Sequence, residues 1–254
     1  MPMEPILSLK HVSLDYNSLN METNAIRDFC LEVKEGEFLA IVGPSGCGKT
    51  SLLSLIAGLI RLSAGSISLM GREVEGPGAS IGYMFQRDHL FEWRTVWQNV
   101  LLGLQVRGTV KNGRGRALDL LKKYGLYDFA NQYPSELSGG MRQRAALIRT
   151  LAVDPKVLLL DEPFSALDYQ TRLTLGDEIS AIIRSEHKTA LFVTHDIAEA
   201  ISVADRIIVL TGRPATVKRS LEIDMPGVPP LMRRNLPSFQ TYFNCIWKEM
   251  DAHA

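Results

Sequence analysis

One glycine-rich stretch, residues 43–50, constrains this chain of 254 residues more than any other. It reads Gly-Pro-Ser-Gly-Cys-Gly-Lys-Thr and follows the apolar run 38–42, whose β-branched members predict a buried strand. After it, apolar residues recur at helical spacing as far as Ile60. A strand, a glycine loop and a helix in this order form the context in which the pattern G-x-x-x-x-G-K-[ST] binds phosphate.

The residue types of this loop explain that chemistry, whereas an ordinary glycine-rich turn would not need them. Glycines let backbone N–H groups turn inward around phosphate oxygens, and Lys49 supplies a positive charge for the β- and γ-phosphates. The Thr50 hydroxyl is a suitable ligand for Mg²⁺. The sequence therefore predicts a nucleoside triphosphate site with these contacts: Gly43, Pro44, Ser45, Gly46, Cys47, Gly48, Lys49, Thr50 and Ser51.

Composition argues against several classes of protein. The 28 basic and 28 acidic residues balance, so no charge surplus favours DNA or RNA as the main partner. The three cysteines, Cys30, Cys47 and Cys245, are odd in number and far apart, which indicates a reducing compartment such as the interior of a cell. No run approaches the ~18 apolar residues of a membrane span, so we expect any membrane role to pass through a partner.

The N-terminal part of the chain predicts an antiparallel sheet. Its first strand alternates in two phases, which indicates a bulge near Lys10 and His11. A polar tip is expected at 17–24, before the second strand. The strands predicted for this sheet are 6–16, 29–33 and 67–69, and 81–85 is predicted as another short strand.

From about residue 87 to 155 strand signals vanish and helical spacing dominates. Because the helices are short and joined by polar loops such as 108–115, we infer an insertion rather than an independent domain. Strand signals then return and alternate with helices, which predicts a parallel sheet covered by helices. The predicted helices are 97–105, 117–124, 141–151, 169–185 and 197–203, and the strands are 157–160, 190–193 and 206–210.

The stretch Leu137-Ser138-Gly139-Gly140 directly precedes a predicted helix. The Ser138 hydroxyl and the free N–H groups of the first turn can bind a phosphate, although Ser-Gly-Gly also starts helices as a simple cap. Its position 23 residues before Asp161 favours the phosphate role.

Two adjacent carboxylates, Asp161 and Glu162, end the predicted strand 157–160. Ligands of open parallel sheets bind at the carboxyl ends of the strands. Asp161 can therefore help to hold Mg²⁺, and Glu162 can act as a general base on the attacking water. His195 ends the next strand and can reach the γ-phosphate from there, although a lone histidine after a strand is often structural.

With the phosphate loop, Gln86, Leu-Ser-Gly-Gly, Asp-Glu and His195 in this order, residues 6–212 resemble the ATP-binding subunits of ABC transporters. The resemblance implies that Tyr16 stacks on adenine and that Gln86 contacts Mg²⁺ and relays to a membrane subunit, so the catalytic set is Glu162, His195 and Gln86. It also implies a head-to-tail dimer, homodimeric or with a paired ATPase subunit. In the dimer that the resemblance implies, each ATP would lie between one phosphate loop and the other subunit's Ser138, Gly139 and Gly140, with Asp168 bridging the halves.

These features together predict an α/β fold within a single ABC ATPase domain, 1–254. It contains a P-loop ATPase core with a mostly parallel sheet and an antiparallel N-terminal β-subdomain, an inserted α-helical subdomain with the Ser138 motif, and a C-terminal tail. The predicted boundaries are 6–86 and 156–212 for the core, 87–155 for the insertion and 213–254 for the tail.

The tail carries an apolar stripe at helical spacing, formed by Phe239, Tyr242, Phe243, Ile246, Trp247 and Met250. The stripe either packs against the core or serves a dimer or regulatory contact. A tail this short, together with the stretch 88–96, resembles the nitrate, sulfonate, taurine and thiamine-precursor importer branch of the family.

The main functional prediction is the ATPase subunit of an importer at the cytoplasmic face of the cell membrane, acting on permease subunits and indirectly on a solute-binding protein. Leu90, Phe91 and Trp93 are expected to contact the permease, unless all three are buried in the insertion. The ATPase of an exporter or of a lipoprotein-release complex is the alternative, because exporters share every catalytic motif with importers. A soluble ABC ATPase is less consistent with the sequence, because this chain has no sustained heptads of the kind that a coiled-coil insertion needs. A P-loop kinase is also less consistent, because it would leave residues 137–140 unexplained.

Overall fold

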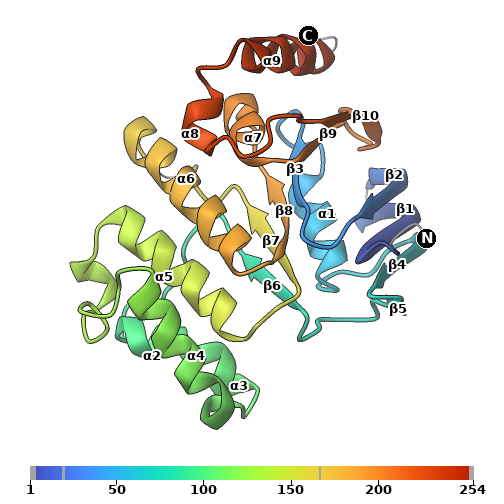
Figure 1. The fold of residues 1–254 in the computed structure, drawn as a ribbon. Helices are drawn as coiled ribbons and strands as arrows, with labels where there is room; N and C mark the ends of the chain where they lie inside the picture. Colours follow the sequence, from blue (N-terminus) through green and yellow to red (C-terminus); the bar gives the residue numbers. More distant parts are fainter. Residues whose placement is uncertain (1–3, 19–20, 166, 252–254) are drawn as a thin grey trace.

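Two β-sheets organise the chain (Figure 1). The computed structural model describes residues 4–18, 21–165 and 167–251. A small antiparallel sheet has the strand order β2-β1-β4-β5, and a large sheet has the order β10-β9-β3-β8-β7-β6. In the large sheet β9, β3, β8, β7 and β6 are parallel, while β10 is an antiparallel edge strand. The predicted α/β class with a mostly parallel sheet is therefore confirmed.

The small sheet contains the predicted bulge and a longer hairpin than expected. Its strands are β1 (Leu7–Ser18), β2 (Met21–Val33), β4 (Ala64–Leu69) and β5 (Arg72–Glu73). The β1–β2 register shifts between Leu9 and Val12, as predicted. The predicted polar tip at 17–24 is wrong, because pairing continues to Ser18 and Met21. Ladder hydrogen bonds join backbone groups and so do not require apolar side chains.

The large sheet includes one strand that the sequence pattern missed. Its members are β3 (Phe38–Val42), β6 (Ile81–Met84), β7 (Val157–Asp161), β8 (Thr189–Val193), β9 (Arg206–Leu210) and β10 (Val217–Glu222). Strand β10 lies at the edge and is largely exposed, so it lacks the apolar run that identifies the central strands.

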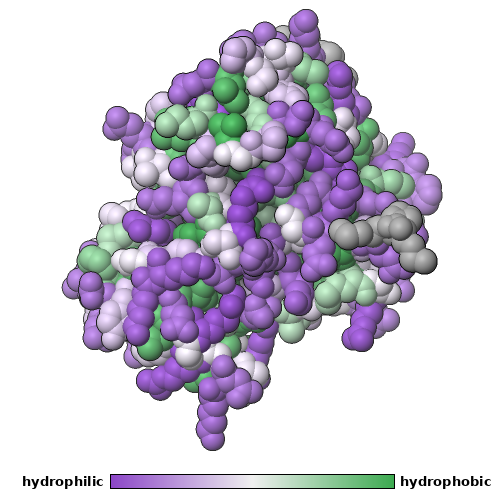
Figure 2. Space-filling view, viewed as in Figure 1, coloured by the Kyte–Doolittle hydropathy of each residue, from purple (hydrophilic) through white to green (hydrophobic). Residues whose placement is uncertain are grey.

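Both faces of the large sheet are buried, because the central strands are apolar on both sides. One face, which includes Ala40, Leu158 and Phe192, shares a core with the helices that follow β6. The opposite face, which includes Leu39 and Leu159, packs with α1 (Lys49–Ile56) and the small sheet. The result is a layered α/β structure, and its visible surface in Figure 2 is mostly hydrophilic with scattered apolar groups.

Four helices and a 3₁₀ turn (Pro134–Glu136) gather beside the β6 end of the large sheet (Figure 1). They are α2 (Val96–Val100), α3 (Leu102–Val106), α4 (Val110–Lys123) and α5 (Gly139–Ala152). Their apolar interior is continuous with that of the sheet. The division of the chain at residues 86, 155 and 212 stays a prediction.

Two details of the helical insertion differ from expectation. The predicted helix 97–105 is two short helices that meet at Leu101. The predicted polar loop 108–115 is wrong, because α4 begins at Val110 and includes Gly113. A Cβ atom at Gly113 would collide with the Leu104 side chain, so this glycine allows α4 to approach α3 closely.

The remaining helices lie on the face of the large sheet that carries Ala40, Leu158 and Phe192. They are α6 (Tyr169–Ser185), α7 (Ile197–Val203), α8 (Pro230–Arg233) and α9 (Pro237–Asp251). The apolar stripe of α9 faces inward through Phe239 and Ile246, which are buried, while Trp247 is 53% exposed. Core packing therefore accounts for most of the stripe.

A buried ion pair joins the two sheets. The Arg206 guanidinium donates to Glu37 Oε1 at 2.6 Å and to the carbonyl of Glu32, at the end of β2, at 2.6 Å. The Glu37 side chain is only 8% exposed, and its Oε2 also accepts a hydrogen bond from the Lys34 N–H. Removing the arginine leaves the Glu37 carboxylate buried without its charged partner.

We expect Arg206→Ala to lower the free energy of unfolding by about 3 kcal/mol, measured by urea denaturation. Arg219→Ala is the matched control, since Arg219 pairs with Glu249 at the surface and its loss should change stability little. Equal effects of the two substitutions would contradict the structural role of the buried pair.

Candidate functional site

Four parallel strands deliver chemically active residues to the same edge of the large sheet. The loop 43–48 follows β3, Gln86 follows β6, Asp161 ends β7, and His195 follows β8. A cavity of about 360 Å³ lies at this edge. Its lining residues are Ser45, Gly46, Gly48, Lys49, Thr50, Ser51, Gln86, Asp161, Glu162 and Arg213. The structure thus brings together residues that are more than 100 positions apart in sequence.

The loop before α1 has the conformation expected of a phosphate cradle. Gly46 and Gly48 have φ values of 73° and 118°, which side chains rarely tolerate. Among the described residues, no side chain caps the first turn of α1, so its positive end is available to an anion. Lys49 is buried, and its ammonium donates to the carbonyls of Gly43 at 2.8 Å and Pro44 at 2.9 Å.

Asp161 connects the phosphate loop to β6. The Thr50 hydroxyl donates to Asp161 Oδ1 at 3.2 Å, and the Tyr83 hydroxyl donates to Oδ2 at 3.2 Å. Burial raises the pKa of Asp161, while the hydrogen bonds from Thr50 and Tyr83 oppose that rise. Burial also raises the pKa of Tyr83, and the neighbouring Asp161 carboxylate raises it further. Oxygen donors at Thr50 and Asp161 form a suitable pair of ligands for Mg²⁺.

Glu162 stands in a strained position at the end of β7. Its φ of 44° lies in the left-handed region, which is costly for a residue with a Cβ and is common at active sites. His195 Nδ1 lies 3.1 Å from Glu162 Oε2. Gln86 lies nearby, because its amide donates to Ser165 Oγ at 3.2 Å and that hydroxyl donates to the Glu162 carbonyl at 3.0 Å.

Tyr16 lies beside the phosphate loop although it comes from the small sheet. Its hydroxyl donates to Ser51 Oγ, in the first turn of α1, at 3.1 Å. The side chain is about half exposed, so one part of its surface is free to contact a ligand.

The Ser138 motif lies at a second cavity, of about 660 Å³, lined by different residues. Ser138, Gly139, Gly140 and Asp168 all border it, at the N-terminal ends of α5 and α6. Ser138 Oγ accepts from the Met141 N–H at 3.3 Å, and Asp168 Oδ1 accepts from the Thr171 N–H at 3.0 Å. Both predicted ligand sets are thus formed by one chain, but at separate places.

Three site residues escaped the sequence prediction. Tyr83 and Ser165 contact Asp161 and Glu162 as described above. Arg213 lines the phosphate-loop cavity and donates to the Gly46 carbonyl at 2.8 Å. Tyr83 gives no motif signal, because its contact depends on the parallel β6–β7 pairing, in which Tyr83 is opposite Leu159.

Comparison with known proteins identifies the family. Residues 26–165, more than half of the chain, match the family described as ABC transporter. This chain belongs to the ABC transporter family. The chain is 47% identical over 249 residues to a Bacillus subtilis protein named uncharacterized ABC transporter ATP-binding protein YtlC, with 97% of this chain and 96% of the relative covered.

Some of the relatives have names that state a solute. The aliphatic sulfonates import ATP-binding protein SsuB of Bacillus licheniformis is 40% identical, with 96% of this chain and 94% of the relative covered. The nitrate import ATP-binding protein NrtD of Synechocystis is 45% identical over 204 residues, with 80% of this chain and 77% of the relative covered.

A solved structure relates the fold to ATP hydrolysis. The dimeric post-hydrolysis state of the ATP-binding cassette MJ0796, bound to ADP and Pi, has a TM-score of 0.72 and 33% identity to this chain. The match covers 86% of this chain and 99% of the cassette. The ABC ATPase therefore has the fold of an ATP-hydrolysing cassette, and ATPase activity follows from its family and this likeness.

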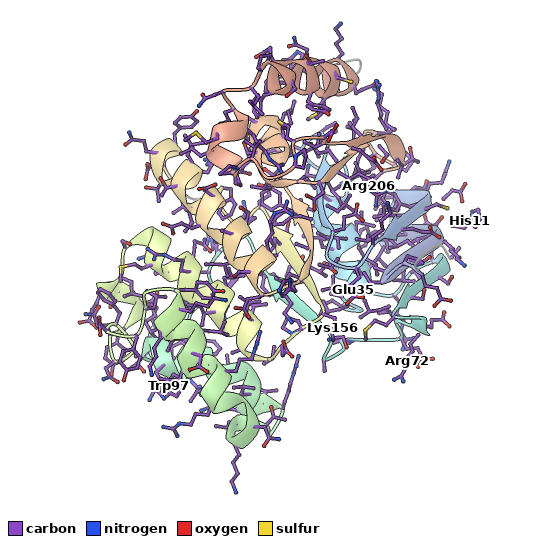
Figure 3. All side chains as sticks on the ribbon, in the orientation of Figure 1. His11, Glu35, Arg72, Trp97, Lys156 and Arg206 are labelled. Carbon is purple, nitrogen blue, oxygen red and sulfur yellow. The ribbon has the colours of Figure 1, made fainter. Side chains whose placement is uncertain are left out.

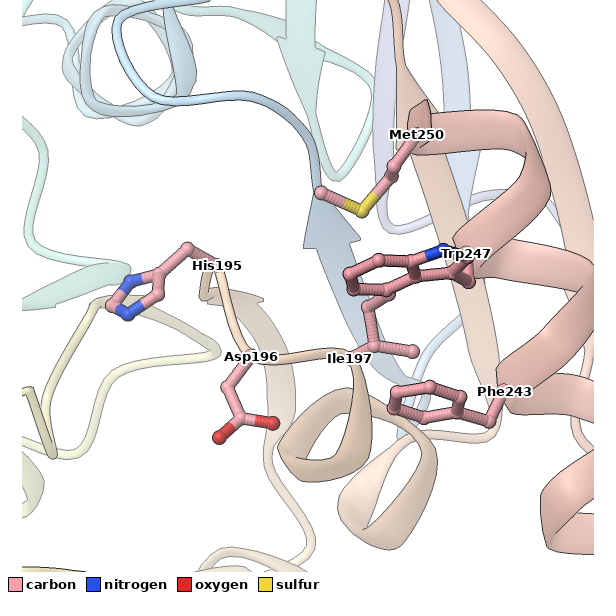
Figure 4. A pocket seen from close by; sticks show the side chains of 6 residues that line it. All are labelled: His195, Asp196, Ile197, Phe243, Trp247 and Met250. Carbon is pink, nitrogen blue, oxygen red and sulfur yellow. The ribbon is translucent and has the colours of Figure 1, made fainter. Parts of the chain in front are cut away.

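Helix α9 lies close to His195. A cavity of about 420 Å³ separates them, lined by His195, Asp196 and Ile197 and by Phe243, Trp247 and Met250. Figure 4 shows Phe243 and Trp247 facing Ile197, while the His195 ring points away from them.

Among residues 4–18, 21–165 and 167–251, no helix is both long and apolar enough to span a membrane.

The raised pKa of Asp161 gives a test of the burial of this carboxylate. The folded chain holds the Asp161 proton to a higher pH than the unfolded chain, so stability falls as pH rises through that window and stays lowered above it. We expect Asp161→Asn to raise the melting temperature of the nucleotide-free protein at neutral pH, with a gain that shrinks on acidification.

Asp168→Asn should have the opposite effect. The Thr171 hydrogen bonds lower the pKa of Asp168, so its charge stabilises the fold at neutral pH and this contribution is lost in acid. Thermal melting roughly between pH 4 and pH 8 compares the two variants. A lower melting temperature for both at neutral pH would contradict the assignment for Asp161.

Proposed function

We propose that this ABC ATPase energises a membrane importer of small anions or related solutes, of the nitrate, sulfonate or taurine type. The names of its relatives support the solute class. The ATPase would act at the cytoplasmic face of the cell membrane, bound to permease subunits that receive solute from a binding protein.

The phosphate-loop cavity supports the following arrangement of substrate. The N–H groups of 45–50 and the Lys49 ammonium bind the phosphates, with Lys49 exchanging its two loop carbonyls for phosphate oxygens. Tyr16 contacts the adenine from the edge of the small sheet. Thr50, Gln86 and Asp161 would hold Mg²⁺, which neutralises charge on the β- and γ-phosphates when bound.

Glu162 and His195 are placed for the hydrolytic step. Glu162 takes a proton from water as the water oxygen bonds to the γ-phosphorus and the bond to the β–γ bridging oxygen breaks. His195 Nδ1, 3.1 Å from Glu162 Oε2, orients the carboxylate. Gln86 and Ser165 link this position to the segment that follows β6.

The separation of the two cavities supports a dimer in which each ATP needs both chains. Ser138, Gly139 and Gly140 border a cavity that lacks the chain's own phosphate loop among its lining residues. Against a partner's phosphate loop, the free N–H groups of α5 would contact the γ-phosphate. Asp168, at the same cavity, would bridge the two chains.

The exposed side chain of Trp93 is the observation that supports a membrane partner, because 72% of this residue is accessible to solvent. Its ring stacks on Phe91 at a centroid distance of 4.8 Å, so the two aromatic rings form one surface. The alternative is that Leu90, Phe91 and Trp93 are all buried in the helical insertion. Leu90 is indeed buried, but Trp93 is not. We assign Phe91 and Trp93 to the permease contact, with Leu90 anchoring the segment.

Polar side chains hold this aromatic surface in place. Asn99 is fully buried, accepts from the Phe91 N–H at 2.8 Å and donates to the carbonyls of Phe91 and Arg94 at 3.1 and 3.0 Å. Arg149 donates to the carbonyls of Asp88 and His89 at 2.7 and 2.6 Å. A fixed segment between Gln86 and Trp93 can transmit nucleotide state to a permease helix.

Glu162→Gln should lower ATP hydrolysis by roughly 10²–10⁴-fold while ATP still binds, because the amide keeps the shape but cannot take the proton. The bound ATP, which is not hydrolysed, should hold the dimer closed. Light scattering with ATP and Mg²⁺ should therefore show more dimer in this variant than in the parent. A monomeric variant that hydrolyses ATP normally would sink the assignment.

Trp93→Ala should leave folding and the ATPase activity of the isolated subunit unchanged and abolish permease binding and transport. Tyr127→Ala is the control, because Tyr127 is also an exposed aromatic residue near these helices. Pull-down of the permease with each variant, together with melting temperatures, separates the roles. Normal transport by Trp93→Ala would remove this residue from the interface.

The importer assignment itself is tested on the assembled complex. The complex is purified from its native membrane, its permease and binding protein are identified, and solutes are screened for stimulation of ATPase activity. Stimulation by nitrate, a sulfonate or taurine supports the proposal. Recovery of the chain with an exporter or without a solute-binding protein would overturn it.

A further inference from the structure

Three side chains with different metal-binding atoms meet on the outer face of the small sheet. They are His11 from β1 and Asp28 and Cys30 from β2, and their ligand atoms all lie within 4.8 Å of one another. His11 Nδ1 is 2.6 Å from Asp28 Oδ1 and 3.9 Å from Cys30 Sγ. Figure 3 shows His11 projecting outward from this sheet, at the edge of the molecule.

The strand bulge brings these residues together. Leu9 pairs with Leu31 and Val12 pairs with Phe29, and all four are buried, so β1 has one more residue than β2 across this interval. The extra residue turns His11 to the solvent face, the side on which Cys30 also lies. The backbones of His11 and Asp28 are both left-handed, with φ values of 51° and 47°.

Backbone contacts hold the donor atoms in position. The His11 N–H donates to Cys30 Sγ at 3.3 Å, so one residue contacts the sulfur with both its backbone and its ring. The Asp28 N–H donates to Ser13 Oγ at 3.1 Å, which fixes the backbone that carries the carboxylate.

We propose that His11, Asp28 and Cys30 bind a zinc ion, with water in the fourth position. Zinc takes nitrogen, sulfur and carboxylate oxygen at roughly 2.0–2.3 Å, which in a tetrahedron separates ligand atoms by about 3.3–3.6 Å. The separation of His11 Nδ1 and Cys30 Sγ is 3.9 Å, slightly longer than that range. The Asp28 carboxylate must move outward as the metal replaces its hydrogen bond to His11, and both side chains are more than two-thirds exposed and free to adjust.

The donor set also separates this site from the nucleotide site. Thr50 and Asp161 offer oxygen alone, which suits Mg²⁺, whereas imidazole and thiolate prefer zinc. If His11 and Asp28 formed only a surface ion pair, they would not need Cys30 beside them, and a surface pair of that kind contributes little to stability. A bound zinc ion would instead cross-link β1 and β2 and stabilise the folded chain.

The test uses the full chain, without a purification tag, stripped of metal and kept in excess Mg²⁺ to occupy the nucleotide site. Zinc is titrated against a chromophoric chelator. We expect one tight equivalent per chain, and at least about tenfold weaker binding in His11→Ala and Cys30→Ser. The matched controls are His187→Ala and Cys245→Ser, since His187 is also an exposed histidine with positive φ.

Two further measurements distinguish a specific zinc site from weak binding at the surface. Zinc should raise the melting temperature of the parent and of both controls, but not of Cys30→Ser. Cobalt should give a sulfur-to-metal charge-transfer band that Cys30→Ser loses. The proposal is overturned if the parent binds no zinc, if His11→Ala and Cys30→Ser bind it as the parent does, or if the cobalt band is missing or survives in Cys30→Ser.

Discussion

The parallel register of β6, β7, β8 and β3 is the constraint on which the rest of the structure depends. It places Asp161 within hydrogen-bonding distance of Thr50, 111 residues earlier in the chain, and of Tyr83 on the neighbouring strand. Side chains alternate along a strand, so a slip of one residue in β7 would turn Asp161 to the opposite face. Because the strands are apolar on both faces, register here is set by packing on each side as well as by hydrogen bonds.

Much of the candidate site could be predicted from sequence, because its parts are local patterns joined by one rule about parallel sheets. The phosphate loop lies between a recognisable strand and helix, Asp161 ends a second strand, and His195 follows a third. The carboxyl ends of parallel strands meet at one edge, which predicts that these residues converge. Tyr83 and Arg213 could not be found this way, since their contacts depend on which strands are neighbours and on the path of the chain after β9.

The parts of the fold that were missed have a common cause: their local pattern does not show their partners. Strand β10 is largely exposed and is recognisable only through its pairing with β9. The first turns of α4 contain Gly113, which usually disfavours a helix, yet close contact with Leu104 requires it. The β1–β2 hairpin similarly extends into polar sequence because cross-strand hydrogen bonds hold it together.

The shared interior of the helical insertion and the large sheet limits how these parts can move. Residues such as Val100, Leu121 and Ala145 belong to the same apolar core as Leu160 and Phe192. A hinge that opened between them would expose this core to water, at a cost that rises with the apolar area exposed. The shared core therefore favours movement of α2–α5 by shear, in which packed side chains slide past one another by small distances without separating.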